Sequence, residues 1–238
     1  MDKFPYITIV IPAYNEQDYI EYSLRSLTHQ VYPRERYEIL VVDNASTDCT
    51  AKIARKWGAT VIPEARKGVA RARQMGFMAA QGSLIASTDA DTAVSPHWLA
   101  HIASAFYENP QLGGVYGPVY WPEAQPIDRW ALQYPATWVL AASNRLGHSL
   151  WWGSNFAVQR DAFMAVGGFS EEMFSGEDTD LSLRMNRQFS IQYDPCLVAY
   201  TSPRRLRIGR VRYVSHTVQH VVQRFILRET LPPMIDIR

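Results

Sequence analysis

The chain has 238 residues, of which 47% are hydrophobic, so it can bury a substantial core, and its length fits one large domain better than two small ones. Lysine and arginine number 24 against 23 acidic residues, and this near balance argues against a nucleic-acid partner. The two cysteines, Cys49 and Cys196, form neither a CxxC pair nor a disulfide framework, which favours a reducing compartment.

Hydrophobic runs in the sequence are short. No segment approaches the roughly 20 consecutive apolar residues that a membrane-spanning helix needs, and the longest candidate, 130–142, contains Gln133 and Pro135. A run near the start, 7–13, is interrupted by Pro12 and is typical of a strand rather than a signal peptide. We therefore expect a cytoplasmic protein, either soluble or peripheral at the inner face of a membrane.

The first third of the chain alternates short β-branched runs with amphipathic stretches, the pattern of βαβ units around a parallel sheet. Strands are expected at 7–11, 38–42, 60–62 and 83–87, with Pro12 ending the first of them. Helices are expected at 16–30, 46–57 and 68–80. In the first helix Ile20, Leu24 and Leu27 share one face, because they are spaced by four and then three residues.

After residue 95 the alternation is looser. The sequence predicts a helix at 96–107, a strand at 113–121, a long helical and aromatic region up to residue 152, a strand at 155–159, a short helix, and a further helix that begins at Glu177. The predicted fold class is α/β, with a mostly parallel central sheet flanked by helices.

Acidic residues follow two of the expected strands. Asp43 closes the second strand, and the fourth strand delivers Asp89-Ala90-Asp91 to its carboxyl end. Ligands of open α/β sheets bind in the crevice beyond these strand ends. We expect the two aspartates of this Asp-X-Asp segment to point apart, so one can face a metal and the other ribose or a basic neighbour. Mg²⁺ and Mn²⁺ bind through few carboxylates together with phosphate oxygens and water. A DxD by itself is better explained by solvated turn residues, but the strand context and the motifs that follow favour a metal site here.

A second acidic pair, Glu177-Asp178, begins a predicted helix after Gly176. Acidic residues in a first helical turn stabilise the helix dipole, which explains one carboxylate but not two. A carboxylate beside an apolar acceptor pocket has a raised pKa and can take a proton from a hydroxyl. The pair is therefore a candidate general base.

Five segments give the sequence a specific joint pattern. They are 10–16 (VIPAYNE), 41–48 (VVDNASTD), 89–91 (DAD), 153–155 (GSN) and 176–181 (GEDTDL). In this order and spacing the chain resembles the family 2 glycosyltransferases of the GT-A fold, over about residues 5–205. The resemblance implies a single GT-A domain over residues 1–238, with a nucleotide-binding half at 1–92, an acceptor-binding half at 93–205, and a C-terminal amphipathic helix and tail at 206–238.

The resemblance also assigns roles on the donor side. The residues that match the segment around the base and ribose are Pro12, Ala13, Tyr14 and Glu16, and Asp43 matches the aspartate that hydrogen-bonds the base or ribose. Arg73 matches a position near the diphosphate, although Gln74 stands where the family usually has asparagine. Asp89, Ala90 and Asp91 match the DxD motif, in which Asp89 and Ala90 contact the nucleotide and the two aspartates, Asp91 above all, hold Mn²⁺ or Mg²⁺.

On the acceptor side, the segment that looks like the contact with donor sugar or acceptor comprises Trp152, Gly153, Ser154 and Asn155. Asp178, beside Glu177, occupies the place of the family's catalytic base, which implies an inverting attack of an acceptor hydroxyl on C1 of the sugar. Some GT-A enzymes supply a metal-binding histidine after this region, whereas this chain has 200–205 (YTSPRR) there. Arg204 or Arg205 is then a phosphate contact, with a solvated basic turn as the alternative.

Three further features have competing explanations. Residues 210–228 predict a basic amphipathic helix, for which packing on the domain is preferred over contact with a membrane or a dimer partner. His216 and His220 are four residues apart, but ordinary surface histidines are preferred over metal ligands. Among the tryptophans of the middle region, Trp151 and Trp152 are favoured for acceptor or lid contact, and the remaining ones for the core: Trp121, Trp130 and Trp138.

The sequence thus predicts an inverting glycosyltransferase that uses Mn²⁺ or Mg²⁺ and a nucleotide-sugar donor. A UDP-sugar is favoured over a GDP-sugar because it is commoner in the family, and the acceptor is a carbohydrate, lipid-linked or small-molecule hydroxyl in polysaccharide, glycolipid or glycoconjugate synthesis. One alternative, a sugar-nucleotidyltransferase, needs a glycine-rich phosphate loop that residues 12–16 do not supply. The other is a non-catalytic nucleotide-sugar binding partner. Loss of Asp178 or Asp91 would have favoured it, but both residues are present.

Overall fold

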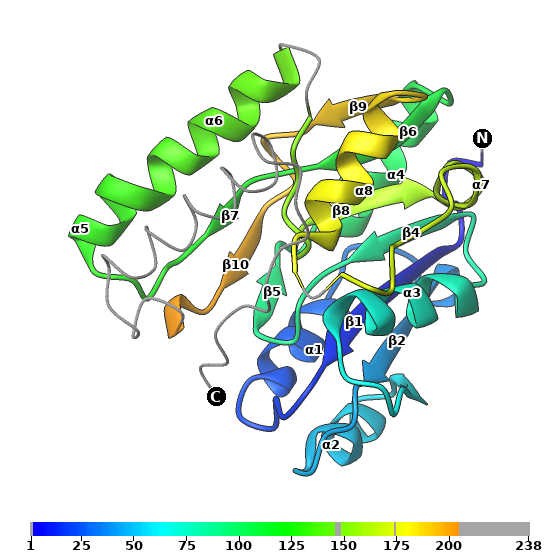
Figure 1. Cartoon of the computed structure of the whole chain (residues 1–238), viewed down its shortest axis with the longest axis vertical. Coiled ribbons are helices and arrows are strands. Elements are labelled where there is room, and N and C mark those ends of the chain that lie inside the picture. Colours follow the sequence, from blue (N-terminus) through cyan, green and yellow to red (C-terminus); the bar gives the residue numbers. More distant parts are fainter. Residues whose placement is uncertain (1, 146–148, 174, 205–238) are drawn as a thin grey trace.

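The computed structural model describes residues 2–145, 149–173 and 175–204. The strands are β1 (Ile7–Ala13), β2 (Tyr37–Asp43), β3 (Thr60–Pro63), β4 (Leu84–Ser87), β5 (Thr92–Val94), β6 (Leu112–Tyr116), β7 (Val119–Tyr120), β8 (Phe156–Gln159), β9 (Ser190–Tyr193) and β10 (Ala199–Thr201). Seven of them form one sheet in the order β3-β2-β1-β4-β8-β6-β9, and a smaller sheet has the order β5-β10-β7 (Figure 1).

Most neighbouring strands of the large sheet run parallel. β1 pairs in parallel with β2 and β4, β2 with β3, and β6 with β9, whereas β8 is antiparallel to both of its neighbours. The prediction of an α/β fold with a mostly parallel central sheet is confirmed. Because β1 and β2 end side by side, with Ala13 opposite Asp43, the loops that follow them meet at one edge of the sheet.

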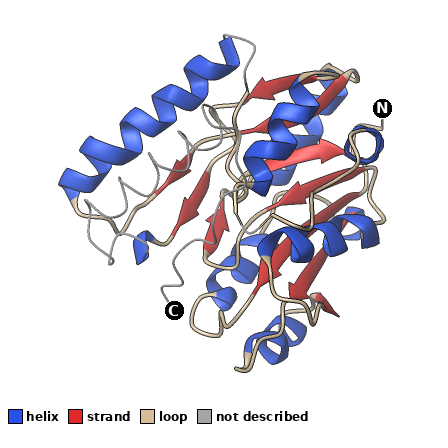
Figure 2. Ribbon diagram, in the orientation of Figure 1, coloured by secondary structure: helices blue, strands red, loops and turns tan. Residues whose placement is uncertain are grey.

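Helices cover both faces of the large sheet (Figure 2). They are α1 (Ile20–Thr28), α2 (Thr50–Lys56), α3 (Val69–Ala79), α4 (Trp98–Glu108), α5 (Pro126–Asp128), α6 (Tyr134–Arg145), α7 (Arg160–Ala165) and α8 (Glu177–Asn186), with a 3-10 turn η1 (Arg34–Arg36) and a π-helical turn η2 (Arg129–Gln133) between α5 and α6. Along β1, Ile9 and Ile11 pack into the cluster that holds Leu24 and Trp98, while Val10 packs into the opposite cluster with Phe77. Successive side chains of a strand face opposite sides, so β1 is buried on both faces.

The first strand is longer than expected, because it continues through Pro12 to Ala13. The pairing of β1 with β4 stops opposite Val10, so Pro12 has a ladder partner only on the β2 side, at Val42. A strand tolerates proline where no neighbour needs its missing N–H. The expectation that Pro12 ends the strand is therefore wrong.

The predicted strand at 113–121 is divided between the two sheets. β6 joins the large sheet and β7 the small one, with Gly117 and Pro118 between them. Gly117 lies directly against the backbone of Leu197, where any side chain would collide. The chain therefore leaves one sheet for the other at a point where only glycine fits.

The helical region of α5, η2 and α6 lies at one side of the molecule, beyond β7 and β10 (Figure 1). Trp130 and Trp138 are 74% and 76% exposed, so their prediction as core residues is wrong, whereas Trp121 is buried as expected. The local pattern shows aromatic residues at helical spacing, but it does not show which face of the helix has a neighbour.

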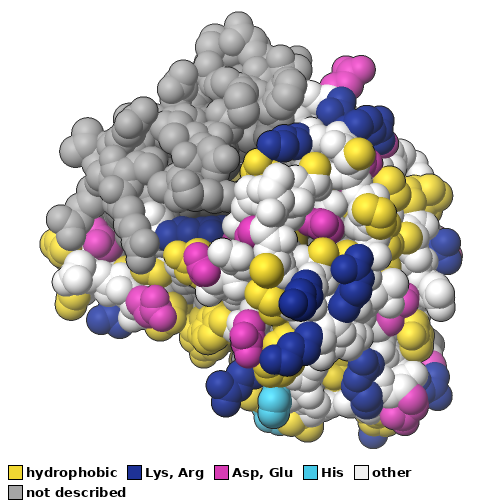
Figure 3. Space-filling view, turned by 90° about the horizontal axis from the view of Figure 1, so that it is seen from below, with side chains coloured by type: hydrophobic (Ala, Val, Ile, Leu, Met, Phe, Trp, Pro, Cys, Tyr) yellow, Lys and Arg dark blue, Asp and Glu magenta, His cyan; other side chains and the backbone are white. Residues whose placement is uncertain are grey.

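No helix among the described residues is long and apolar enough to cross a membrane. The predicted amphipathic helix at 210–228, with His216 and His220, lies outside the described residues. Both cysteines, Cys49 and Cys196, are exposed free thiols. On the face seen in Figure 3, Lys and Arg side chains are interspersed with Asp and Glu side chains, in line with the balanced charge of the sequence.

Candidate active site

The loops after β1 and β2 are tied to each other by hydrogen bonds. The backbone N–H of Asn15 donates to Ser46 Oγ (2.9 Å), and the N–H of Thr47 donates to Asn15 Oδ1 (2.8 Å). Asn15 and Ala45 both have positive φ, at 53° and 62°. Such backbone angles are uncommon outside glycine and gather at functional loops. These loops occupy the first turns of the predicted helices, which is why α1 begins at Ile20 rather than residue 16 and α2 at Thr50 rather than residue 46.

Tyr14 and Asp43 are both predicted to contact the nucleotide; Tyr14 lies on the loop after β1, and Asp43 is the last residue of β2. Lys67 Nζ is 4.4 Å from the Tyr14 ring centroid and donates to its hydroxyl at 2.5 Å. Asp43 Oδ1 accepts from the N–H of Ser46 at 3.3 Å. Pro12 and Ala13 are the last residues of β1 and lead directly into Tyr14.

Asn44 is a buried residue that the sequence interpretation did not assign. Its Nδ2 donates to the carbonyls of Glu64 and Arg66, and its Oδ1 accepts from the N–H of Gly68 at 2.8 Å. It therefore holds the segment between β3 and α3 beside Asp43. The one signal in the sequence was an amide side chain directly after a strand-ending aspartate.

Asp89, Ala90 and Asp91 form a turn between β4 and β5 rather than an extended segment. The turn lets the two carboxylates diverge, whereas side chains two residues apart in an extended strand share one face. Asp89 Oδ1 is 2.6 Å from Arg73 Nη2, whereas Asp91 Oδ2 is 2.9 Å from Arg204 Nε. Each aspartate of the motif thus belongs to a different ion-pair cluster.

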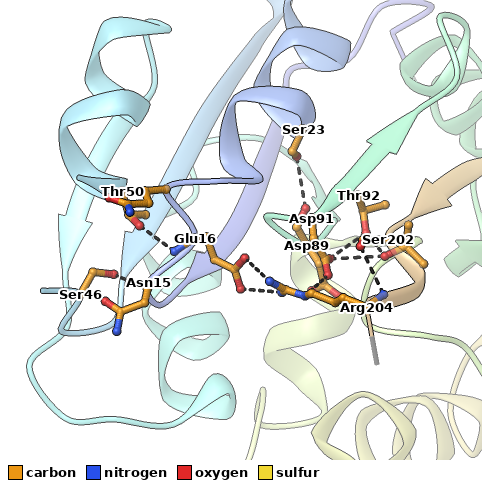
Figure 4. Close-up of polar contacts among 12 residues, drawn as sticks. Asn15, Glu16, Ser23, Ser46, Thr50, Asp89, Asp91, Thr92, Ser202 and Arg204 are labelled. Atoms are coloured by element: carbon orange, nitrogen blue, oxygen red, sulfur yellow. Dashed lines mark hydrogen bonds and ion pairs between the residues drawn. The ribbon is translucent and has the colours of Figure 1, made fainter. Parts of the chain in front are cut away.

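The first cluster, called here the Arg204 cluster, comprises Arg204, Glu16 and Asp91 (Figure 4). Arg204 Nη1 and Nη2 donate to Glu16 Oε2 and Oε1 at 2.8 and 2.7 Å, a bidentate pair. Glu16 was predicted beside the ribose, but its carboxylate is buried against this guanidinium. Arg205, the other predicted phosphate contact, lies outside the described residues.

The second cluster, the Arg73 cluster, comprises Arg73, Asp89 and Glu177. The Arg73 guanidinium is 4% exposed and makes a very short contact with Glu177 as well as the pair with Asp89. A side chain at Gly153 would collide with this guanidinium. Its Nη1 and Nη2 are paired with Glu177 and Asp89, so the contact of Arg73 with a diphosphate stays a prediction.

Glu177 and Asp178 occupy different environments although they are adjacent. Burial raises the pKa of Glu177 to about 7, against the opposing pull of Arg73. Asp178 is only partly buried, and its Oδ2 accepts from the N–H of Gly153 at 2.7 Å. The preceding Gly176 has φ of 72°, a left-handed angle that lets α8 begin with this pair facing the site. Asp178 is thus the more accessible carboxylate, and Glu177 the one locked in place.

The segment 152–155 approaches α8 but presents few polar groups outward. Asn155 is fully buried: its Oδ1 accepts from Trp98 Nε1, and its Nδ2 donates to the carbonyls of Pro118 and Leu197. The prediction that Asn155 contacts a sugar is therefore corrected, because its three hydrogen bonds brace the loop from within. Ser154 is also buried, and the carbonyl of Gly153 accepts from Ser87 Oγ.

Two neighbouring tryptophans of this segment have different surroundings. Trp151 is buried and stacked on Phe156, with ring centroids 4.8 Å apart, so its prediction as an acceptor contact is wrong. Trp152 is partly buried and stacks on Trp121 at 6.3 Å with nearly parallel planes. Of the pair, only Trp152 retains an exposed part.

Comparison with known proteins bears directly on this arrangement. The family model described as Glycosyl transferase family 2 matches residues 8–169, which include the loops after β1 and β2 and both aspartates of the DxD motif. The chain belongs to glycosyl transferase family 2. The resemblance inferred from the sequence is confirmed.

Relatives of this family 2 chain carry glycosyltransferase names. A probable glycosyltransferase YdaM of Bacillus subtilis is 26% identical over 216 residues, which cover 84% of this chain and 51% of the relative. Glycosyltransferase AglE of Haloferax volcanii is 36% identical over 101 residues, which cover 40% and 33%. The chain thus spans a third to about half the length of these relatives.

Solved structures of similar fold include donor complexes. A mannosyltransferase, PcManGT from Pyrobaculum calidifontis in complex with GDP-Man and Mn²⁺, matches with a TM-score of 0.74 and 26% identity, over 96% of this chain and 66% of that one. S. aureus TarS in complex with UDP-GlcNAc matches with a TM-score of 0.66 and 20% identity, over 82% and 58%. These likenesses confirm the GT-A fold of the family 2 chain.

The residues of the family 2 site suit a hard divalent cation. The carboxylates of Asp91 and Glu16 both face the Arg204 guanidinium, so they already converge on one positive charge. The hydroxyls of Thr92 and Thr201 lie 3.4 and 3.3 Å from Asp91 Oδ1. Among the described residues no three His, Cys, Asp or Glu side chains gather closely enough to hold a metal alone. Mg²⁺ and Mn²⁺ are commonly held by one or two carboxylates plus substrate phosphates, so this donor set fits.

Proposed function

We propose that the chain is the catalytic domain of a glycosyltransferase that transfers a sugar from a nucleoside-diphosphate sugar to a hydroxyl acceptor. The observation that carries this proposal is the meeting of three features at one sheet edge: the cross-linked loops after β1 and β2, the DxD aspartates held by two arginines, and Asp178 on α8. Membership of family 2 supports the same activity.

On the donor side, Tyr14 and Asp43 contact the base and ribose, and Lys67 adds a cation beside them. Asp91, with Asp89 behind it, holds Mn²⁺ or Mg²⁺, which supplies positive charge to the diphosphate leaving group. Arg204 contacts the phosphates, since a guanidinium pairs with phosphate oxygens bidentately. The donor is a UDP-sugar or a GDP-sugar, the two classes bound by TarS and PcManGT respectively.

On the acceptor side, Asp178 takes the proton from the attacking hydroxyl, which makes the reaction inverting. The N–H of Gly153 donates to Asp178 Oδ2 and the N–H of Thr179 donates to Oδ1, which hold the partly exposed carboxylate in position for the acceptor. Glu177 and Arg73 hold α8 against the DxD turn and so position Asp178. Trp152 provides an aromatic surface beside Gly153 for a sugar ring.

The acceptor is a carbohydrate or a lipid-linked hydroxyl. A relative from Nostoc, 26% identical over 204 residues, is named beta-monoglucosyldiacylglycerol synthase, which supports a lipid among the candidate acceptors. Membrane contact through residues 210–228 belongs to the same proposal, because a basic amphipathic helix binds anionic lipid surfaces.

Replacing Asp178 tests the proposed base. With Asp178→Asn, nucleoside-diphosphate release from donor and an acceptor panel falls by about 10²–10⁴-fold, the usual contribution of a general base, while donor binding is kept. Asp180→Asn, in the same helical turn but paired with Arg184, is the matched control and keeps most activity. Full activity of Asp178→Asn would remove Asp178 from the mechanism, and the anomeric configuration of the product, read by NMR, decides inversion.

A further inference from the structure

The contacts of Arg204 leave its guanidinium fully engaged. Two nitrogens face the two oxygens of Glu16, Nε faces Asp91 at 2.9 Å, and the guanidinium carbon lies 4.5 Å from the Tyr19 ring centroid. The side chain is 12% exposed. Figure 4 shows it bridging two elements, the β1–α1 loop and the DxD turn. A group in this state is not available to a phosphate until it exchanges partners.

The two carboxylates that Arg204 bridges need a counter-charge. Glu16 and Asp91 are 3% and 6% exposed, and buried carboxylates are costly unless they are paired. The Arg204 guanidinium places a positive charge between these two negative ones. Arg204 therefore stabilises the arrangement that presents Asp91, the residue proposed above as the metal ligand.

We infer that Arg204 is a built-in counter-ion that competes with the divalent metal for Asp91 and Glu16, and that it transfers to the nucleoside diphosphate when metal and donor bind together. This inference rests on the proposed metal site at Asp91. Electrostatics favours this exchange. The two carboxylates would face a divalent cation instead of the single charge of Arg204, and the diphosphate offers the guanidinium a new bidentate partner.

The surroundings of Asp91 allow the exchange without loss of the carboxylate's position. The hydroxyls of Thr92 and Thr201 donate to Oδ1, whereas Arg204 occupies Oδ2. The N–H of Ser202 donates to the Asp91 carbonyl at 3.2 Å, which fixes the backbone as well. Arg204 follows the last residue of β10, Thr201, by only three positions, so its side chain departs from a strand end. These contacts allow the Asp91 carboxylate to keep its position when Arg204 moves away.

The exchange makes metal and nucleotide binding cooperative. Metal alone must break the contacts of Arg204, and nucleotide lowers this cost by accepting the released guanidinium. Such a coupling is reciprocal, so each ligand strengthens the binding of the other by the same factor. Removal of the Arg204 charge should therefore strengthen the binding of metal alone and weaken the coupling.

The test is a titration of Mn²⁺ without nucleotide, read from the EPR signal of free Mn²⁺. Arg204→Met keeps the aliphatic stem, and we expect it to bind Mn²⁺ at least about tenfold more tightly than the wild type, with a similar loss in the enhancement that UDP or GDP confers. Arg36→Met, which removes an exposed arginine paired with Asp2, is the control and leaves the Mn²⁺ affinity unchanged. The thermal stabilisation by Mn²⁺ alone should also be larger in Arg204→Met.

Equal or weaker Mn²⁺ binding by folded Arg204→Met would overturn the inference. If this variant does not fold, Arg204→Gln decides, because it removes the charge but keeps hydrogen-bond donors toward the two carboxylates: tighter Mn²⁺ binding supports the exchange, and unchanged binding refutes it. Asp91→Asn separates this inference from the proposed function. If it leaves metal-dependent nucleotide binding intact, the metal site fails; if it abolishes that binding and Arg204→Met shows no gain, only the counter-ion fails.

Discussion

At the scale of single residues, the contrast between Glu177 and Asp178 carries most of the chemistry. Glu177 is enclosed with Arg73 and Asp89, whereas Asp178 accepts from the backbone N–H groups of Gly153 and Thr179 and stays partly exposed. The residue pattern predicted that the pair was more than a helix cap, and the resemblance placed the catalytic base at Asp178 but gave Glu177 no separate role. Their difference arises from Arg73 of α3, which is distant in sequence, forms an ion pair with Glu177 and links it to Asp89 of the DxD turn.

The raised pKa of Glu177 predicts a pH-dependent stability. Burial raises the pKa from the usual 4.5 to about 7, so in this window the folded state binds more protons than the unfolded chain. The free energy of unfolding therefore falls as pH rises through the window, by about 3 kcal/mol at most. Glu177→Gln stays neutral and should match the wild type near about pH 4, below the unfolded-state pKa, but exceed its stability near about pH 8.

Urea unfolding of both proteins at the two pH values measures this difference. Glu172→Gln, an exposed glutamate in the preceding loop, is the control and should follow the wild-type profile. The same fall in stability in Glu177→Gln as in the wild type would show that Glu177 does not carry a raised pKa.

At the scale of elements, the approach of the 152–155 segment to α3 and α8 depends on Gly153. Its N–H donates to Asp178, and the space where a Cβ would lie is filled by the Arg73 guanidinium. No periodicity in the sequence reveals this contact. The resemblance marked Gly153 as a sugar contact, whereas the described structure gives it a packing role between two functional side chains.

Gly153→Ala should destabilise the protein by about 1–3 kcal/mol, the range typical of overpacking in a close-packed site. All three of the nearest atoms to the added carbon belong to Arg73, so in an Arg73→Ala background the same change should cost much less. A double-mutant cycle from denaturant unfolding measures this coupling. Additive effects of the two substitutions would contradict the proposed collision.

The boundaries of the elements show what local patterns do and do not encode. Apolar spacing predicted the buried face of α1, and Ile20, Leu24 and Leu27 are all fully buried. The true starts of α1 and α2 were missed because the loop residues before them bond to each other across the site. Such cross-loop bonds join residues about 31 positions apart and leave no periodic signal.

At the scale of the whole molecule, the fold was the most predictable feature. β-branched runs alternating with helices indicate a parallel sheet whatever the ligand, and both faces of β1 are covered as that pattern requires. The partners within the site were less predictable. Arg204 and Glu16 are 188 positions apart, and each was assigned to the nucleotide separately, with no signal that they pair with each other.

The most direct test of the central claim is calorimetric titration of UDP and GDP, with and without Mn²⁺, on the wild type and on Asp91→Ala. We predict that one nucleotide binds in a metal-dependent manner and that Asp91→Ala abolishes this dependence, because Asp91 is the proposed metal ligand of the donor site. Thermal unfolding of the variant controls for its fold. Absence of binding of either nucleotide to the folded wild type in the presence of Mn²⁺ would contradict the account.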